Sequence, residues 1–166
     1  MPRMDDPSYQ WRGPFADAEV NALHAEGFGH PVLATGWREQ VERHSLGWVC
    51  AHDADRLVGF VNVAWDGGVH AFVVDTVVAA GARHRGIGVG LLDVARREAR
   101  AAGCEWLHVD FEEEQRGFYL GACGFAPTPA GVIALASRSA QLADATPTTG
   151  LLRTVPPSDP KKLASP

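Results

Sequence analysis

The sequence predicts an α/β (α+β) protein with a mixed, mostly antiparallel sheet of six to seven strands and helices on both faces. Two observations lead to this fold class. Three segments rich in β-formers follow one another between residues 47 and 78, divided by short Asp- and Gly-containing turns, as in an antiparallel meander. An amphipathic segment and another alternating segment follow, so the unit 69–111 should form a right-handed crossover between parallel strands.

The predicted strands each carry a local signal. Val and Phe dominate residues 69–78, and Asp66-Gly67-Gly68 before them is a strong hairpin signal. Apolar residues alternate over 105–111, which predicts a strand with one buried face. The predicted strands cover residues 47–52, 56–65, 69–78 and 105–111, with two more short ones within 125–135.

The predicted helices follow from apolar residues at helical spacing. The longest, residues 87–102, has apolar side chains on one face and charged ones on the other, and Gly103 is suited to end it. The predicted helices cover residues 14–24, 37–44, 87–102 and 115–122.

Composition favours one globular domain over residues 1–136, followed by a Pro-, Ser-, Thr- and Ala-rich tail over 137–166 that we expect to be disordered. The net charge of -5 lacks the basic character typical of nucleic-acid binders, so we expect no nucleic-acid partner. No apolar run approaches the roughly 20 residues of a membrane span, and the N-terminus carries no apolar signal segment. Three scattered cysteines predict no metal site, and we expect a cytoplasmic protein.

The segment 83–90 combines two arginines with a GxGxG pattern at the predicted strand-to-helix junction. The first amides of a helix lack partners and carry partial positive charge, so they attract phosphate, and glycines let a ligand approach the backbone. The segment therefore predicts a pyrophosphate-binding loop. Its residues are Arg83, His84, Arg85, Gly86, Ile87, Gly88, Val89 and Gly90.

This loop has three other interpretations. A P-loop requires a Lys after its last glycine, and none stands here. The dinucleotide fingerprint has the spacing GxGxxG and opens a βαβ unit, whereas this loop follows three meander strands. The glycines could also serve only to let the helix and its neighbours pack closely.

Two motifs together resemble one family. Arg83-His84-Arg85-Gly86-Ile87-Gly88 matches the [QR]-x-x-G-x-[GA] signature of the GCN5-related N-acetyltransferases (GNAT). About 30 residues downstream, Phe118-Tyr119 followed by Gly124-Phe125 is similar to a second family element, and the two motifs occur in the family's order. The resemblance covers roughly residues 15–135 and implies a GNAT-like fold that uses acetyl-CoA.

The resemblance also implies where acetyl-CoA would bind. The pantetheine arm would pair with the strand edge at Thr76, Val77 and Val78, and the loop amides would cradle the pyrophosphate. Tyr119 would protonate the departing thiolate, which a nearby O–H donor stabilises as charge develops. The alternative for Tyr119 is a core residue packed between Phe118 and Phe125. The family's usual Asn before the second motif is missing, and Gln115 or Arg116 could replace it.

The acceptor amine must lose a proton before it attacks, so a base would help. Asp75 interrupts an apolar strand, where a lone carboxylate would be costly, and Asp110 lies near the end of the next strand. Asp75 could instead accept a structural hydrogen bond from a loop amide. The acidic residues 112–114 next to Asp110 could attract a cationic amine or simply form a solvated helix start.

We therefore expect an N-acetyltransferase that moves an acetyl group from acetyl-CoA to a primary amine of a small molecule or protein. Direct attack in a ternary complex is expected, because no cysteine stands where a nucleophile would. The indole rings of Trp37, Trp48 and Trp65 could line an acceptor pocket or belong to the core. A non-catalytic acyl-CoA-binding module and a binder of another nucleotide are the alternatives. The oligomeric state, a homodimer included, is left open.

Overall fold

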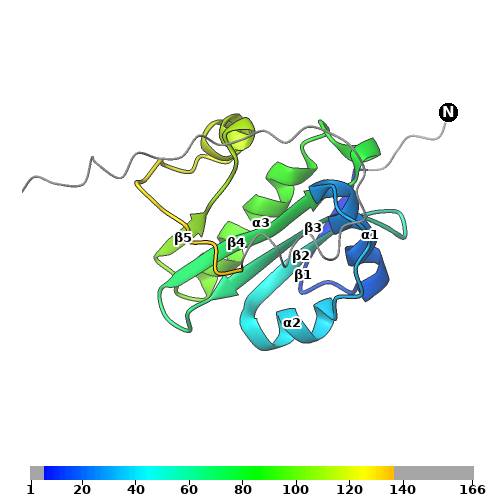
Figure 1. Ribbon diagram of the computed structural model, residues 1–166, viewed down its shortest axis with the longest axis horizontal. Coiled ribbons are helices and arrows are strands. Elements are labelled where there is room, and N and C mark those ends of the chain that lie inside the picture. Colours follow the sequence, from blue (N-terminus) through cyan, green and yellow to red (C-terminus); the bar gives the residue numbers. More distant parts are fainter. Residues whose placement is uncertain (1–5, 137–166) are drawn as a thin grey trace, which may run out of the picture. The chain divides into compact units, whose positions relative to one another are not determined.

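The sheet holds five strands in the order in which the chain forms them (Figure 1). The structure is a computed structural model that describes residues 6–136. The strands are β1 (Ser8–Trp11), β2 (Ser45–Asp53), β3 (Arg56–Trp65), β4 (His70–Val78) and β5 (Trp106–Val109). The first four pair antiparallel, and β5 runs parallel to β4. The predicted fold class and the parallel crossover are therefore confirmed.

Helices cover both faces of this sheet, as predicted. Helix α3 (Ile87–Ala101) packs on one face, where its apolar side chains share a core with residues from β2, β3 and β4. Helices α1 (Asp17–Phe28) and α2 (Trp37–His44) pack on the other face around a second core that contains Phe60 and Val77. Both faces of β2 and β3 are thereby buried, which explains their nearly continuous apolar sequences.

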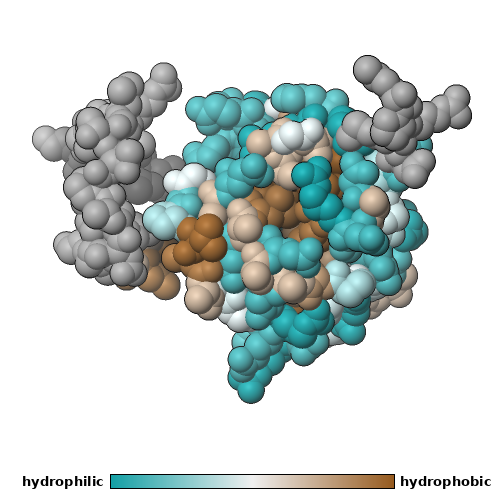
Figure 2. Space-filling model, turned by 90° about the vertical axis from the view of Figure 1, so that its right-hand side faces the viewer, coloured by the Kyte–Doolittle hydropathy of each residue, from teal (hydrophilic) through white to brown (hydrophobic). Residues whose placement is uncertain are grey.

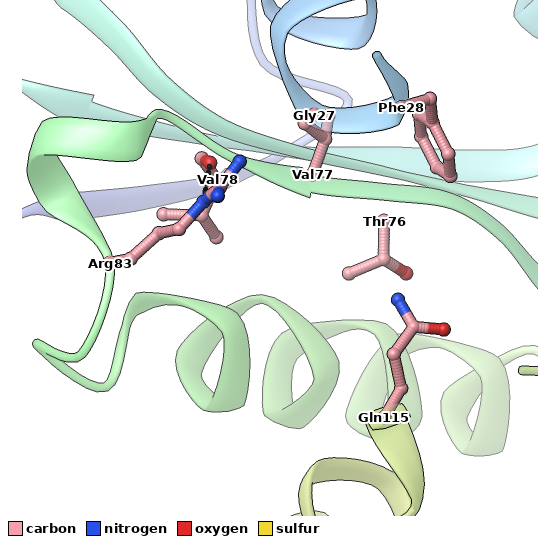
Figure 3. A pocket seen from close by; sticks show the side chains of 7 residues that line it. All are labelled: Gly27, Phe28, Thr76, Val77, Val78, Arg83 and Gln115. Atoms are coloured by element: carbon pink, nitrogen blue, oxygen red, sulfur yellow. Dashed lines mark hydrogen bonds between the residues drawn. The ribbon is translucent and has the colours of Figure 1, made fainter. Parts of the chain in front are cut away.

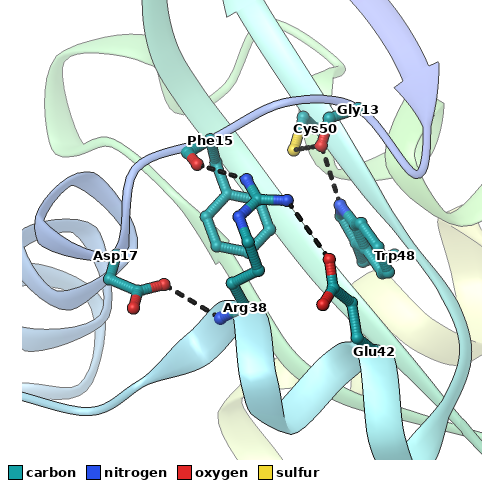
Figure 4. A network of polar contacts seen from close by, with 7 residues as sticks. All are labelled: Gly13, Phe15, Asp17, Arg38, Glu42, Trp48 and Cys50. Atoms are coloured by element: carbon teal, nitrogen blue, oxygen red, sulfur yellow. Dashed lines mark hydrogen bonds and ion pairs between the residues drawn. The ribbon is translucent and has the colours of Figure 1, made fainter.

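A network of polar contacts fixes the two N-terminal helices to each other and to the sheet (Figure 4). The backbone N–H of Arg38 donates to the Asp17 carboxylate over 2.9 Å, and the Arg38 guanidinium donates to the Phe15 carbonyl over 2.6 Å. The same guanidinium lies over the Phe15 ring, 4.6 Å from its centroid. Next to this network the Trp48 indole donates to the Gly13 carbonyl, so the chain before α1 is tied to β2.

Several boundaries differ from the prediction. The short strand β1 was missed, and α1 begins and ends later than residues 14–24. Residues 113–122 form a 3-10 turn, η2 (Glu113–Gln115), and a π-helical turn, η3 (Gly117–Ala122), instead of one helix. A further 3-10 turn, η1 (Ala80–Ala82), follows β4.

The two strands predicted within 125–135 are wrong, so the described residues hold five strands and not six or seven. Pro127 and Pro129 have no N–H group to donate to a neighbouring strand, so this segment loses hydrogen bonds that strand pairing needs. The apolar pattern that suggested the strands does not show this loss. The described chain divides into a unit that ends at Gly131 and another that starts at Val132, whose described apolar side chains are exposed.

The predicted tail, 137–166, lies outside the described residues. Within the part of the chain that is described, no helix has the length and apolar character needed to cross a membrane.

Candidate active site

Strands β4 and β5 separate halfway along β4. Their pairing runs only from His70 opposite Trp106 to Val73 opposite Val109. Just beyond this point β4 contains a bulge, because Asp75 and Thr76 together oppose the single residue Val61 of β3. Asp75 has a left-handed backbone (φ 56°), which Asp tolerates better than most residues. From Val74 to Val78, β4 therefore has no strand partner on its β5 side within the described chain.

Two adjoining cavities lie at this separation. The first, of about 240 Å³, is lined by residues of α1, β4 and the following loop together with Gln115 (Figure 3). The second, of about 190 Å³, reaches from β4 to η3. The lining of the first is Gly27, Phe28, Thr76, Val77, Val78, Arg83 and Gln115, and that of the second is Phe28, Val73, Val74, Asp75, Thr76, Asp110, Gln115 and Tyr119. Figure 2, which views the molecule from the right-hand side of Figure 1, shows recessed apolar surface framed by hydrophilic residues.

The predicted phosphate loop leads into α3, and the amides of Ile87, Gly88 and Val89 have no hydrogen-bond partner among the described residues. No side chain caps the helix at Gly86. The Gly90 amide, by contrast, donates to the Gly86 carbonyl over 3.0 Å, so the helix takes it up. Three consecutive unpaired N–H groups at the positive end of a 15-residue helix have the chemistry to hold an anion.

The three glycines of the loop serve two different purposes. Gly86 has a φ of 79°, a conformation that favours glycine over other residues. A Cβ atom at Gly88 would lie 2.9 Å from the Phe118 ring, and one at Gly90 would collide with the Tyr9 ring. Close packing therefore accounts for Gly88 and Gly90, while the conformation of the turn accounts for Gly86.

The two arginines of the loop point to different places. The Arg83 Nε donates to the Val78 carbonyl over 3.1 Å, and its side chain lines the first cavity (Figure 3). Arg85 instead forms an ion pair with Asp53, the last residue of β2, with 3.4 Å between Nη1 and Oδ2. His84 has a left-handed backbone and an exposed side chain that lines neither cavity.

Tyr119 is both a core residue and a cavity residue: its ring packs in an aromatic cluster, and it also lines the second cavity. It is only 5% exposed and lies against the rings of Phe118, Phe111 and Phe125. Burial raises the pKa of its phenol, an effect that the neighbouring Thr76 hydroxyl opposes. That hydroxyl is itself buried and has no well-formed hydrogen bond, so it is an orphaned polar atom in the lining of both cavities.

The Asp75 carboxylate is paired with a histidine and not with a loop amide. Its Oδ1 lies 3.1 Å from Nε2 of His24 on α1. The Nδ1 atom of His24 lies 2.7 Å from Nε2 of His30, which follows the helix. Asp110 is exposed and lines the same cavity as Asp75 and Tyr119, so the structure brings all three predicted catalytic residues to one cavity.

Gln115, and not Arg116, occupies the place near β4. The Glu112 amide donates to Gln115 Oε1 over 3.2 Å, and the side-chain nitrogen is turned toward Thr76 (Figure 3). Arg116 is instead directed to Glu113, with 3.7 Å between charged atoms. Gln115 is therefore placed to contact a ligand that lies along the open edge of β4.

Helix α1 supplies site residues that the sequence did not reveal. Phe28 lines both cavities, and Gly27 packs directly against Val77 because a Cβ atom there would collide with that side chain. His24 and Asp75 stand 51 positions apart, and no local pattern links them. Trp37 and Trp48 lie in the core, Trp65 is 40% exposed, and none of the three lines either cavity.

Comparison with known proteins gives one family and one fold. A family model described as the acetyltransferase (GNAT) family matches residues 9–125. None of the curated proteins compared with the chain matches it. Among solved structures, a GNAT-family acetyltransferase from Streptococcus pneumoniae is 22% identical with a TM-score of 0.60, over 89% of this chain and 99% of that one.

Two further solved structures are similar to this chain, one with a named activity and one with a named ligand. Glucosamine-6-phosphate N-acetyltransferase from Arabidopsis thaliana is 13% identical with a TM-score of 0.60, over 76% of this chain and 97% of that one. AAC(6')-Iy, in complex with the bisubstrate analogue CoA-S-monomethyl-acetylneamine, is 18% identical with a TM-score of 0.64, over 80% and 99%. At these identities the likeness establishes the shared fold.

Proposed function

Because the chain belongs to the acetyltransferase (GNAT) family, we propose that it transfers an acetyl group from acetyl-CoA to a primary amine by direct attack in a ternary complex. The acceptor is a small molecule or a protein amine. The N-acetyltransferase activity named for the plant structure and the CoA-containing bisubstrate analogue bound to AAC(6')-Iy agree with this reaction class.

One observation carries the proposal: an anion site, an open strand edge and an acid–base cavity are consecutive along the fold. The unpaired amides of Ile87 to Val89 fit a pyrophosphate. The open edge of β4 and the orphaned Thr76 hydroxyl fit a chain with amide groups, as pantetheine is. The second cavity, which holds Tyr119, adjoins this edge through Thr76 and Gln115.

The residues of the second cavity suit aminolysis of a thioester. An alkyl ammonium has a pKa near 10.4, so Asp75 or Asp110 would remove its proton before the neutral amine attacks the carbonyl carbon. Tyr119 would then donate its phenolic proton to the thiolate as the carbon–sulfur bond breaks. A phenol with its ordinary pKa near 10 is already protonated at neutral pH, as this role requires, and burial raises the pKa of Tyr119 further.

A turnover assay tests the proposal. CoA release from acetyl-CoA is measured with a panel of primary amines for the wild type and for Tyr119→Phe. We expect kcat to fall about 100-fold or more in the variant, a typical size for the loss of a general acid, while its affinity for CoA is kept. Tyr9→Phe is the matched control, since Tyr9 lines neither cavity and should retain wild-type turnover.

Two outcomes would contradict the proposal in different ways. CoA binding without turnover for every amine would favour a non-catalytic acyl-CoA-binding module. Turnover that Tyr119→Phe leaves unchanged would remove Tyr119 as the acid while leaving the overall reaction intact.

A further inference from the structure

Asp75, His24 and His30 form a continuous hydrogen-bonded chain that starts in the second cavity. The first contact joins Asp75 Oδ1 to His24 Nε2 over 3.1 Å, and the second joins His24 Nδ1 to His30 Nε2 over 2.7 Å. A third contact, also of 2.7 Å, joins His30 Nδ1 to the Pro31 carbonyl oxygen. Every polar atom of both imidazoles therefore has a partner.

The direction of this chain is fixed at one end. A carbonyl oxygen only accepts, so Nδ1 of His30 must carry a proton. The two remaining contacts each need one proton as well, whichever partner donates it. The three contacts thus contain three protons, whereas an ionised carboxylate with two neutral imidazoles holds only two. A form of the chain in which all three contacts are hydrogen bonds therefore holds one proton more than the form with neutral histidines and an ionised carboxylate.

The two ends of the chain face different surroundings. Asp75 lines the cavity that also holds Tyr119 and Asp110. His30 follows α1 and is only partly buried, next to the exposed residues 31–34. Between the ends, His24 is held among the rings of Phe28 and Trp37, with centroids 4.3 and 5.1 Å away. A path for a proton therefore leads from the cavity through α1 to the surface.

We propose that Asp75, His24 and His30 act as a proton relay that carries the acceptor's proton from the cavity to solvent, an inference that rests on the proposed acetyl transfer. The fully bonded arrangement is the loaded form. Release of a proton at His30 gives the unloaded form, with Asp75 ionised. Asp75 then takes a proton from the ammonium group, and the proton passes through His24 to His30.

The proton balance of the whole reaction is then complete. The ammonium gives one proton to the relay, and the resulting amine forms the carbon–nitrogen bond. As the carbon–sulfur bond breaks, Tyr119 gives its proton to the thiolate and regains one from the nitrogen of the intermediate. The products are the amide and CoA thiol, with one proton released to solvent through His30. Asp75 contacts the acceptor, and His24 and His30 act through it.

Other ionisable groups around the relay are few. Asp110 and Tyr119 line the same cavity as Asp75. Glu26, on the same helix as His24, accepts a hydrogen bond from the Ala80 amide over 2.9 Å. A pH profile of the enzyme must therefore be compared between variants of His24 and His30, in which Asp110 and Tyr119 are unchanged.

Kinetics of His24→Gln and His30→Gln test the relay. We expect kcat to fall about tenfold or more in both variants, which is a smaller fall than the complete loss of a general base would cause. The KM for acetyl-CoA should be unchanged. In His24→Gln the acidic limb of the kcat profile should move to lower pH, because the base is then a carboxylate that is no longer linked to the imidazoles. His44→Gln, on the exposed last residue of α2, is the control and should match the wild type.

A second measurement does not depend on activity. Ring ¹⁵N shifts of His24 and His30 in the wild type, followed over pH, should show His30 Nδ1 protonated and count the protons that the chain shares. His24→Gln could unfold the protein, since His24 packs against Trp37, so CoA binding and thermal unfolding are measured beside it, and the more exposed His30→Gln gives the answer if it does.

The outcomes separate the two proposals. No transfer to any amine would contradict the proposed function, and the ring shifts would still decide the proton count. An active wild type with unchanged rate and pH limb in both variants would overturn the relay. So would a His30 ring that carries no proton on Nδ1.

Discussion

Gly88 has two features that a side chain would disturb. Its α-carbon faces the Phe118 ring, and its N–H has no partner among the described residues. The Val side chain in Gly88→Val would press on that ring and cover the anion site. We expect CoA affinity to fall at least tenfold, as measured by calorimetry, with lower thermal stability. Gly81→Ala is the control, because a Cβ atom there meets nothing within 4 Å.

That comparison also distinguishes packing from binding. If Gly88→Val loses stability but binds CoA as tightly as the wild type, the loop glycine serves packing alone, and the free amides of the loop do not hold the ligand.

The buried Cys50 thiol makes the fold sensitive to alkali. It is fully buried, donates to the Gly13 carbonyl over 3.6 Å, and burial raises its pKa to about 12. A free thiol has a pKa near 8.5, so its stabilising contribution is complete below that pH and is lost as pH rises toward about 12. We expect urea unfolding to show a further loss of about 1–2 kcal/mol between pH 8 and pH 10 that Cys50→Ala lacks.

Equal pH slopes in the wild type and Cys50→Ala would contradict this account of Cys50. The raised pKa values of Tyr9, Tyr119 and Cys123, which act in the same direction, would then cause the alkaline loss of stability.

At the scale of the elements, the packing of α2 depends more on the contacts of one arginine than on the ion pairs of the helix. Arg38 bonds to Asp17 and Phe15 and stacks on the Phe15 ring, which ties α2 to the start of α1. We expect Arg38→Ala to lower the free energy of unfolding by about 1–3 kcal/mol, since a part-buried charged hydrogen bond and a cation–π contact are lost. Chemical denaturation measures it.

Arg43→Ala on the same helix is the matched control. Its partner is Glu39 at 3.3 Å, and both side chains are about 70% exposed, so the change should cost less than about 0.5 kcal/mol. Equal losses in the two variants would show that helix propensity, and not the network of Arg38, sets the effect.

Elements with a strong local pattern were predictable from the sequence, and those shaped by distant contacts were not. The apolar face of α3 and the Val-rich sequence of β4 located both elements within one residue of their ends. The bulge at Asp75 was not visible, because it depends on the pairing with Val61 and on the end of β5. β1 was missed because its sequence, SYQW, is short and only partly buried.

On the scale of the whole molecule, the motifs predicted which residues lie together at the two cavities, but not which other residues pack around them. Tyr119, Asp75 and Asp110 meet at one cavity, and Arg83 and Thr76 to Val78 line the other. Helix α1 closes this site from the opposite face of the sheet with Phe28 and His24. Neither residue belongs to a motif, since the contacts arise only when α1 packs against β4.

The central claim is that the loop before α3 and the open edge of β4 together hold CoA. Calorimetric titration of the protein with CoA, with ATP and NAD as comparison ligands, tests it most directly. We expect one CoA per chain, bound at least tenfold more tightly than either nucleotide, because only CoA has a pantetheine arm to occupy the edge from Thr76 to Val78. Equal or tighter binding of ATP or NAD, or no detectable binding of CoA, would contradict it.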